Sequence, residues 1–269
     1  MVSDLLRGYE ARLRDRDIGA SSGPTPVRDK FEPDGNIKPF YGLTCIAWVD
    51  QGSELFQKLC DLQESLRKEL EEAGLGHVFA FLEPASFHMT VCDIVASSSP
   101  IQPRYGDVLI RQVRAAFAQI GNPGQVNAQI RGIGLKRTIT ALVKFDRERE
   151  LKKVLAMEHI IKQSIRQSTD ADLTGLARIS SFRPFAGHIS LAYCVQDPGA
   201  GNVGRIKEIL LQYDKEIGEF AFSQFDLTCF PHMNAYRPIL TIDLKDGTVT
   251  RHNRRKECQH NEEESRLCQ

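Results

Sequence analysis

The chain has 269 residues, and its 35 Lys and Arg residues balance 35 Asp and Glu residues, so the formal net charge at pH 7 is zero. Hydrophobic residues make up 41% and charged residues 26%, which is typical of a soluble globular protein of one or two domains. The balanced charge disfavours a broad basic surface for nucleic acid, and no apolar run is long enough to span a membrane. The N-terminal residues lack the features of a targeting peptide, so we expect a cytoplasmic protein.

The chain divides into three segments by composition. Residues 1–40 are expected to form an N-terminal arm, because 17–40 is rich in Gly, Pro, Ser and Asp. Residues 41–245 are expected to form a single domain. Residues 246–269 contain few apolar side chains and are expected to form a disordered tail.

Helical and strand-like patterns alternate through the central segment. Hydrophobic periodicity predicts, in chain order, a strand at 41–49, a helix at 53–73, a strand at 86–94, a helix at 105–120, strands at 125–133 and 138–145, a helix at 147–168, a strand at 187–194, a helix at 203–217 and strands near 219–230 and 238–244. The order helix, strand, helix, strand, strand thus occurs twice, in half-lobes of about 41–146 and 147–245. We predict an α+β fold whose halves pack about a pseudo-two-fold axis.

The seven cysteines are scattered, odd in number and never arranged as Cys-x-x-Cys. This pattern disfavours a disulfide framework and a zinc site built on cysteines. Cys92, Cys194 and Cys229 lie in strand-like apolar runs, where cysteine is usually a small core residue. We expect neither a metal ion nor a cofactor.

Two equivalent strands each contain a histidine followed two residues later by a hydroxyl group: SFHMTVC, with His88 and Thr90, and AGHISLAY, with His188 and Ser190. Alternate residues of a strand share a face. We therefore expect Cys92 on the polar face of the first strand and Ala192 on that of the second. One such triplet alone would more often be structural. Two triplets at equivalent points of a repeat favour one shared site.

Paired imidazoles suit the chemistry of phosphodiesters. One neutral histidine can take a proton from water or an attacking hydroxyl, and a protonated histidine can donate to the departing oxygen. The hydroxyls of Thr90 and Ser190 can donate hydrogen bonds to the phosphate oxygens, and this division of labour needs no metal. The pseudo-symmetry leaves open which histidine is the acid and which the base.

The paired motifs resemble those of the 2H phosphoesterase superfamily, which includes RNA 2′,3′-cyclic phosphodiesterases and LigT proteins. The runs KFEPDGNIKPFYGLT at 30–44 and EPASFHMTV at 83–91 look more narrowly like its DUF1868 group. The resemblance implies a bilobal fold with two antiparallel sheets, flanked by helices, around a central cleft. It also implies that His88, Thr90, His188 and Ser190 are catalytic, and that the substrate is a 2′,3′-cyclic phosphate or a related phosphodiester of a small nucleotide or RNA terminus.

Two further side chains have competing interpretations, and a third is assigned to the core. Arg183, in SFRPFAGH, is a candidate for phosphate binding from the rim of the cleft, although its position favours a solvated loop charge. Tyr41 is a candidate for stacking on a base, although its position at the start of a strand favours a core role. Tyr193 is expected on the face opposite His188, in the core.

Two other functions stay open. A non-catalytic module of the same fold would bind a nucleotide or RNA without turnover. An interaction protein would show neither binding nor turnover, and the sequence itself implies no obligate protein partner. Turnover and binding assays with cyclic nucleotides distinguish the three.

Overall fold

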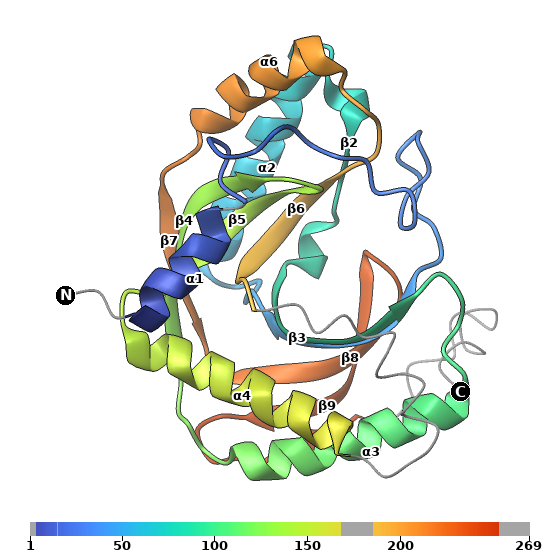
Figure 1. The fold of residues 1–269 in the computed structure, drawn as a ribbon, viewed down its shortest axis with the longest axis vertical. Coiled ribbons are helices and arrows are strands. Elements are labelled where there is room, and N and C mark those ends of the chain that lie inside the picture. Colours follow the sequence, from blue (N-terminus) through green and yellow to red (C-terminus); the bar gives the residue numbers. More distant parts are fainter. Residues whose placement is uncertain (1–3, 15, 168–184, 253–269) are drawn as a thin grey trace.

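The structure, a computed structural model, describes residues 4–14, 16–167 and 185–252 (Figure 1). Its helices are α1 (Asp4–Arg14), α2 (Glu54–Glu72), α3 (Pro103–Ile120), α4 (Glu148–Arg166) and α6 (Ala200–Leu211), with short 3-10 turns η1 (Gly76–Val78) and η2 (Pro84–Ser86). Its strands are β1 (Tyr41–Trp48), β2 (Phe79–Phe81), β3 (His88–Ser97), β4 (Val126–Leu135), β5 (Thr138–Lys144), β6 (His188–Cys194), β7 (Glu216–Phe222), β8 (Gln224–His232), β9 (Ala235–Asp243) and β10 (Val249–Arg251). The predicted α+β class is confirmed.

The described strands form one antiparallel sheet of ten strands, in the order β10-β9-β8-β1-β3-β6-β5-β4-β7, with β2 added beside β6. The prediction of two separate sheets is therefore wrong. The two expected sheets are joined into one because β3 pairs with β6, at Met89 and Ile189 only. One backbone pair thus joins two groups of strands that are otherwise extensively paired within themselves.

Each half of this sheet draws strands from both predicted half-lobes, 41–146 and 147–245. One half contains β1 and β3 together with β8, β9 and β10, and the other contains β2, β4 and β5 together with β6 and β7. The β4–β5 hairpin therefore packs beside β6, and the β8–β9 hairpin packs beside β1. Each hairpin thus lies in the half of the sheet opposite to the one that chain order suggests. The predicted domain boundaries themselves stay a prediction.

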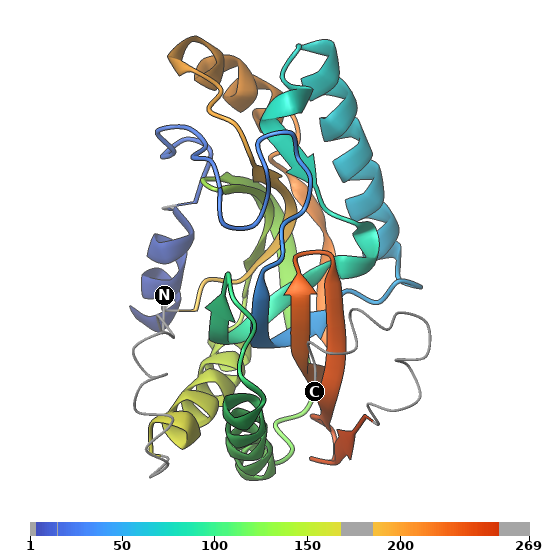
Figure 2. The ribbon, with the colours of Figure 1, turned by 90° about the vertical axis from the view of Figure 1, so that its right-hand side faces the viewer.

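The helices cover the sheet in two groups at opposite ends of the molecule, α2 with α6 and α3 with α4 (Figures 1 and 2). α2 forms because leucines recur at helical spacing and all are buried against the sheet, with Ser53 capping the first turn through its hydroxyl oxygen. α2 contacts β7, and α4 contacts β3 and β4. No described helix is long and apolar enough to cross a membrane.

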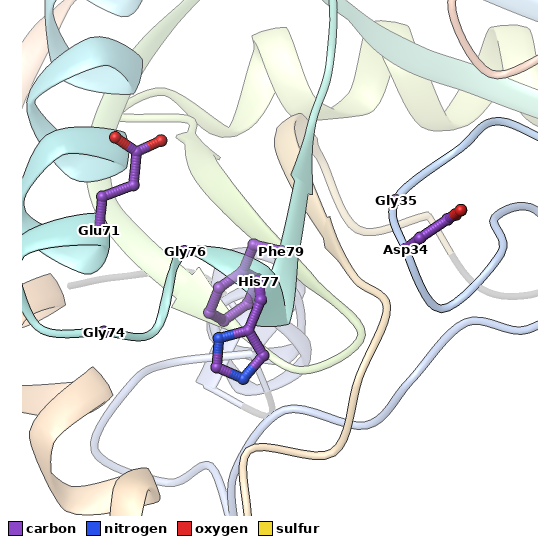
Figure 3. A pocket seen from close by; sticks show the side chains of 7 residues that line it. All are labelled: Asp34, Gly35, Glu71, Gly74, Gly76, His77 and Phe79. Atoms are coloured by element: carbon purple, nitrogen blue, oxygen red, sulfur yellow. The ribbon is translucent and has the colours of Figure 1, made fainter.

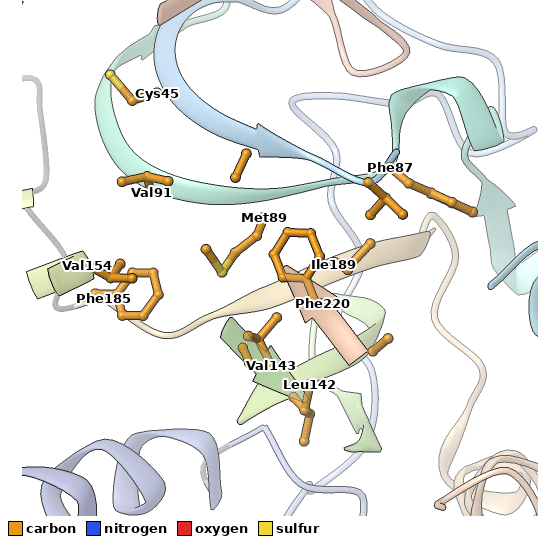
Figure 4. Close-up of a cluster of buried hydrophobic side chains, with 14 of the residues drawn as sticks. Cys45, Phe87, Met89, Val91, Leu142, Val143, Val154, Phe185, Ile189 and Phe220 are labelled. Carbon is orange, nitrogen blue, oxygen red and sulfur yellow. The ribbon is translucent and has the colours of Figure 1, made fainter. Parts of the chain in front are cut away.

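The apolar faces of β3 and β6 meet in the core between the sheet and the helices. Met89 and Ile189, the pair that joins the halves, are both fully buried there among Phe87, Phe185 and Phe220 (Figure 4). Because successive residues of a strand point to opposite faces, burial of Met89 and Ile189 turns the flanking histidines to the other face.

Three predicted elements differ from the structure. The helix predicted at 203–217 ends at Leu211, and the single strand predicted at 219–230 is two strands that meet at Ser223. Residues 249–251, within the expected disordered tail, pair with β9 as β10. Residues 253–269 lie outside the described residues.

The N-terminal arm is more structured than expected. Helix α1 packs into the main core through Leu6, Tyr9 and Leu13. Residues 17–40 are largely irregular, as predicted, and end beside the β8–β9 turn, where the Phe40 N–H donates to the carbonyl of Pro231 (Figure 2). A second apolar cluster joins this arm to both halves of the sheet and contains Phe31, Phe40, Ala80, Leu82, Val195, Phe230 and Met233.

Candidate active site

The two predicted motifs lie side by side where the halves of the sheet join. His88 and Thr90 belong to β3, and His188 and Ser190 belong to β6. The strands are antiparallel and pair at the residues between each histidine and its hydroxyl. Extending this register by one residue in each direction sets His88 opposite Ser190 and Thr90 opposite His188. All four side chains are half-buried, on the face opposite the core.

Both imidazoles are held in the same way by the backbone. Nδ1 of His88 lies 2.6 Å from the carbonyl oxygen of Ser86, and Nδ1 of His188 lies 2.8 Å from that of Ala186. A carbonyl oxygen only accepts, so Nδ1 carries the proton in both rings. The other nitrogen, Nε2, is then unprotonated in the neutral ring and is the atom that can take up a proton.

The hydroxyls of Thr90 and Ser190 differ from three threonine hydroxyls of strands β1, β8 and β9. Thr44, Thr228 and Thr241 each donate a hydrogen bond to a protein oxygen. No contact of this kind involves Thr90 or Ser190 within the part of the chain that the structure describes. Their donors are therefore free to meet a ligand on the histidine face.

A β-bulge follows the first motif. Thr90 pairs with Ile46 and Cys92 pairs with Cys45, so Val91 is an extra residue in β3. Such a residue reverses the alternation of side chains beyond it. Cys92 consequently turns to the core and is 1% exposed. The prediction that Cys92 shares the face of the histidine is wrong for this reason.

A second bulge follows the second motif, at Leu191, which is the equivalent position. Ser190 and Ala192 pair with successive residues of β5, leaving Leu191 unpaired. Ala192 is therefore in the core, contrary to the prediction. Tyr193, Ser190 and His188 pair with alternate residues of β5, so all three share one face. The prediction that Tyr193 lies opposite His188 is also wrong.

Aromatic side chains flank His88 on the side of β1 and β9. The Tyr236 ring lies edge-on to the imidazole with centroids 4.5 Å apart, and the Trp48 ring lies 6.0 Å away. The indole N–H of Trp48 donates to the buried carboxylate of Asp226 at 2.7 Å, which fixes the ring. Sequence reasoning missed these residues, although Trp48 is the only tryptophan of the chain and lies near the end of a predicted strand.

The environment of both histidines favours the neutral form. Burial lowers the pKa of His88 to about 4 and that of His188 to about 3. The positive charge of Arg16 lowers the pKa of His188 further, and that of Lys30 acts in the same direction on both histidines. Both cations come from the N-terminal arm, and sequence reasoning missed them because nothing local marks a loop cation as close to a distant strand.

The structure does not bring Tyr41 to the histidines. Tyr41 begins β1 and pairs with Ser97, whereas His88 pairs with Trp48 at the other end of the strand. The two ends are separated by seven residues of extended chain, about 23 Å along the strand. Arg183, the other predicted substrate-binding residue, lies outside the described residues.

A separate pocket of about 400 Å³ lies between the arm, the end of α2 and η1 (Figure 3). None of the predicted site residues lines it, and its His77 makes no hydrogen bond to the nearby carboxylates in the described structure. Among these residues, no group of three His, Cys, Asp or Glu side chains is arranged to hold a metal ion. The lining residues are Asp34, Gly35, Glu71, Gly74, Gly76, His77 and Phe79.

One protein family matches part of the chain. Residues 30–105 match the family 2H-phosphodiest, described as a domain of unknown function (DUF1868). The predicted resemblance to the DUF1868 group of the 2H phosphoesterases is therefore confirmed. The matched segment includes the His88 motif and ends before the His188 motif. No curated protein matches the chain.

One solved structure shares the fold, and others resemble it more weakly. A conserved protein of unknown function from Agrobacterium tumefaciens is 17% identical, with a TM-score of 0.58, over 92% of this chain and 100% of the relative. Escherichia coli LigT in apo form is 11% identical, with a TM-score of 0.47, over 78% of this chain and 100% of LigT. LigT in complex with 3′-AMP is 11% identical, with a TM-score of 0.47, over 76% of this chain and 98% of LigT. The Agrobacterium protein thus shows a common fold, without indicating the reaction.

Proposed function

We propose that this protein is a cytoplasmic, metal-independent phosphoesterase that hydrolyses a 2′,3′-cyclic phosphate or a related phosphodiester of a small nucleotide or RNA end. The observation that carries the proposal is the pairing of β3 and β6 at Met89 and Ile189. This register brings two imidazoles and two uncommitted hydroxyls to one face. The equivalent bulges at Val91 and Leu191 support a pseudo-two-fold relation between the motifs.

The residues divide the reaction between them as follows. The Nε2 atom of one histidine takes a proton from water as the water oxygen bonds to phosphorus. The bond from phosphorus to a ribose oxygen breaks, and the second histidine, protonated at Nε2, donates its proton to that oxygen. Thr90 and Ser190 donate hydrogen bonds to the non-bridging phosphate oxygens, where negative charge develops. The pKa of both histidines is lowered, so the pKa values do not assign the acid.

Two features of the site support a nucleotide as the substrate. Tyr236 and Trp48 present aromatic rings beside His88, and aromatic rings are the side chains on which unpaired bases stack. Arg16 and Lys30 place positive charge near the histidines in a chain of zero net charge. This local charge favours an anionic substrate.

The test is turnover of nucleoside 2′,3′-cyclic phosphates by the wild-type chain and by His88→Ala and His188→Ala. We expect each single substitution to reduce kcat by roughly 10²–10⁴-fold. We also expect a bell-shaped pH profile and unchanged activity in EDTA. His159→Ala, which removes an exposed imidazole of helix α4 outside both motifs, serves as the matched control. Full activity in both histidine variants would overturn the proposal, and nucleotide binding without turnover would favour the non-catalytic module.

A further inference from the structure

Lys30 of the N-terminal arm has an ammonium group that lies between two aromatic rings. Its Nζ donates a hydrogen bond to the Tyr193 hydroxyl at 3.3 Å and lies 4.9 Å from the ring centroids of both Phe40 and Tyr193. No carboxylate is within ion-pair distance in the described structure. The Tyr193 hydroxyl takes up one of the three N–H donors of the ammonium group, so two donors are available for a ligand. The two rings hold the cation in place.

The acidic neighbours of Lys30 are engaged elsewhere. Asp29 lies 3.7 Å from the guanidinium of Arg137, and Glu32 lies 3.3 Å from the ammonium of Lys38. Both carboxylates thus pair with other cations, and neither is an ion-pair partner of Lys30. Because a half-buried charge without a counter-ion costs free energy, an anionic ligand at this point would stabilise the site.

The position of Lys30 separates it from the phosphate that the motif hydroxyls would bind. Tyr193, its hydrogen-bond partner, lies on the histidine face beyond Ser190 and the bulge, opposite the next alternate residue of β5, which is about 7 Å along the strand. Lys30 is still near enough for its charge to lower the pKa of both histidines. It is therefore adjacent to the reacting groups and displaced from them along β6.

We propose that Lys30, held between Phe40 and Tyr193, forms a subsite for a second phosphate group of the substrate, beside the one that reacts. This inference rests on the proposed function for the identity of the reacting bond. The substrate class is then narrowed to nucleotides with two phosphates on one nucleoside, such as a 2′,3′-cyclic phosphate that also carries a 5′-phosphate. An RNA end supplies the same chemistry through its preceding internucleotide phosphate.

The experiment compares two substrates in the same preparation, adenosine 2′,3′-cyclic phosphate with and without a 5′-phosphate. We expect the wild-type kcat/KM to be at least about tenfold higher with the 5′-phosphate, as for a hydrogen bond between charged groups. Lys30→Met should reduce this ratio towards one, and Lys30→Arg should keep most of it. Arg28→Met removes an exposed charge from the same arm and should keep the ratio. A ratio within one preparation does not depend on the fraction of folded protein.

A binding measurement separates failure of this inference from failure of the proposed function. Calorimetry compares adenosine 3′,5′-bisphosphate with adenosine 3′-monophosphate, neither of which requires turnover. Tighter binding of the bisphosphate that Lys30→Met abolishes would support the subsite even if no cyclic phosphate were hydrolysed. Equal ratios in wild type and Lys30→Met, or no preference for the second phosphate in either assay, would overturn it. If Lys30→Met lowered kcat/KM to the same degree for both substrates, Lys30 would contact the reacting phosphate and the proposal of a second subsite would fail.

Discussion

The hydroxyl of Tyr9 holds Gly187, the residue immediately before His188. It accepts a hydrogen bond from the Gly187 N–H at 3.0 Å and donates one to the carbonyl of Val143 at 2.7 Å. A helix at the start of the chain thereby fixes the entry to a strand 178 residues later. Burial raises the pKa of this phenol, so it stays neutral and can both donate and accept.

Tyr9→Phe removes both hydrogen bonds and leaves a buried N–H and a buried carbonyl without partners. We expect the free energy of unfolding to fall by about 1–3 kcal/mol in urea titrations. We also expect kcat to fall while the KM for a cyclic nucleotide changes little, because His188 would lose its fixed position.

Tyr105→Phe is the matched control, since its hydroxyl accepts an exposed hydrogen bond from Arg104. Its unfolding free energy should change by less than about 0.5 kcal/mol. If Tyr9→Phe were as stable and as active as this control, α1 would have no part in positioning the site.

Gly187 is required by the same contact. A Cβ atom at this position would lie 2.6 Å from the Tyr9 hydroxyl oxygen and 3.0 Å from Cβ of Val143. We expect Gly187→Ala to cost about 1–3 kcal/mol of unfolding free energy. In the Tyr9→Phe background the nearest clashing atom is absent, so the same change should cost less, by at least about 0.5 kcal/mol. Strictly additive costs in the four-protein cycle would contradict this explanation.

The histidine motifs could be predicted because their information is local. Alternating apolar residues identify the strand, and the alternation assigns His88 and Thr90 to one face without knowledge of any partner. The prediction fails from the next residue onward, because a bulge depends on how a neighbouring strand pairs. Val91 and Leu191 look like ordinary alternating residues, and only β1 and β5 show that each is extra.

Long-range placement explains the other differences. The pair that merges the two sheets joins residues 100 positions apart, and no pattern near Met89 or Ile189 indicates it. The same holds for Lys30, whose partner Tyr193 is 163 residues away. Helix α1 is a different case. Its buried residues recur at helical spacing, so the sequence contains the helical periodicity, but many charged residues lie among them.

Thr140 carries a buried hydroxyl without a partner. It is 1% exposed, and its Oγ1 makes no hydrogen bond in the described structure. Valine has the same shape without the polar atom, so we expect Thr140→Val to raise the free energy of unfolding by about 1 kcal/mol. Thr228→Val should act in the opposite direction, because the equally buried hydroxyl of Thr228 donates to the carbonyl of Thr44 at 3.2 Å. Destabilisation by both substitutions in urea titrations would show that Thr140 has a partner in solution.

Trp48 makes the protonation of His88 directly measurable. It is the only tryptophan of the chain, and its ring lies 6.0 Å from the imidazole. A protonated imidazole quenches indole fluorescence, so the emission reports the charge on His88. Burial lowers the pKa of His88 from 6.5 to about 4, so the folded protein should show quenching with a midpoint well below pH 6.5. The unfolded chain binds this proton more readily than the folded one, so acid between these two pH values also destabilises the fold.

The fluorescence titration needs two variants to assign the transition. His88→Asn should abolish the acidic quenching, because asparagine does not titrate. His188→Asn should keep it, since the group beside Trp48 is still present, with a midpoint that stays below pH 6.5 because burial is the main cause of the shift. Unfolding is monitored in parallel by circular dichroism, so that only the range in which the fold is intact is analysed. A wild-type midpoint near pH 6.5 would show that His88 is solvated, and the acid limb of the activity profile would then move to the same pH.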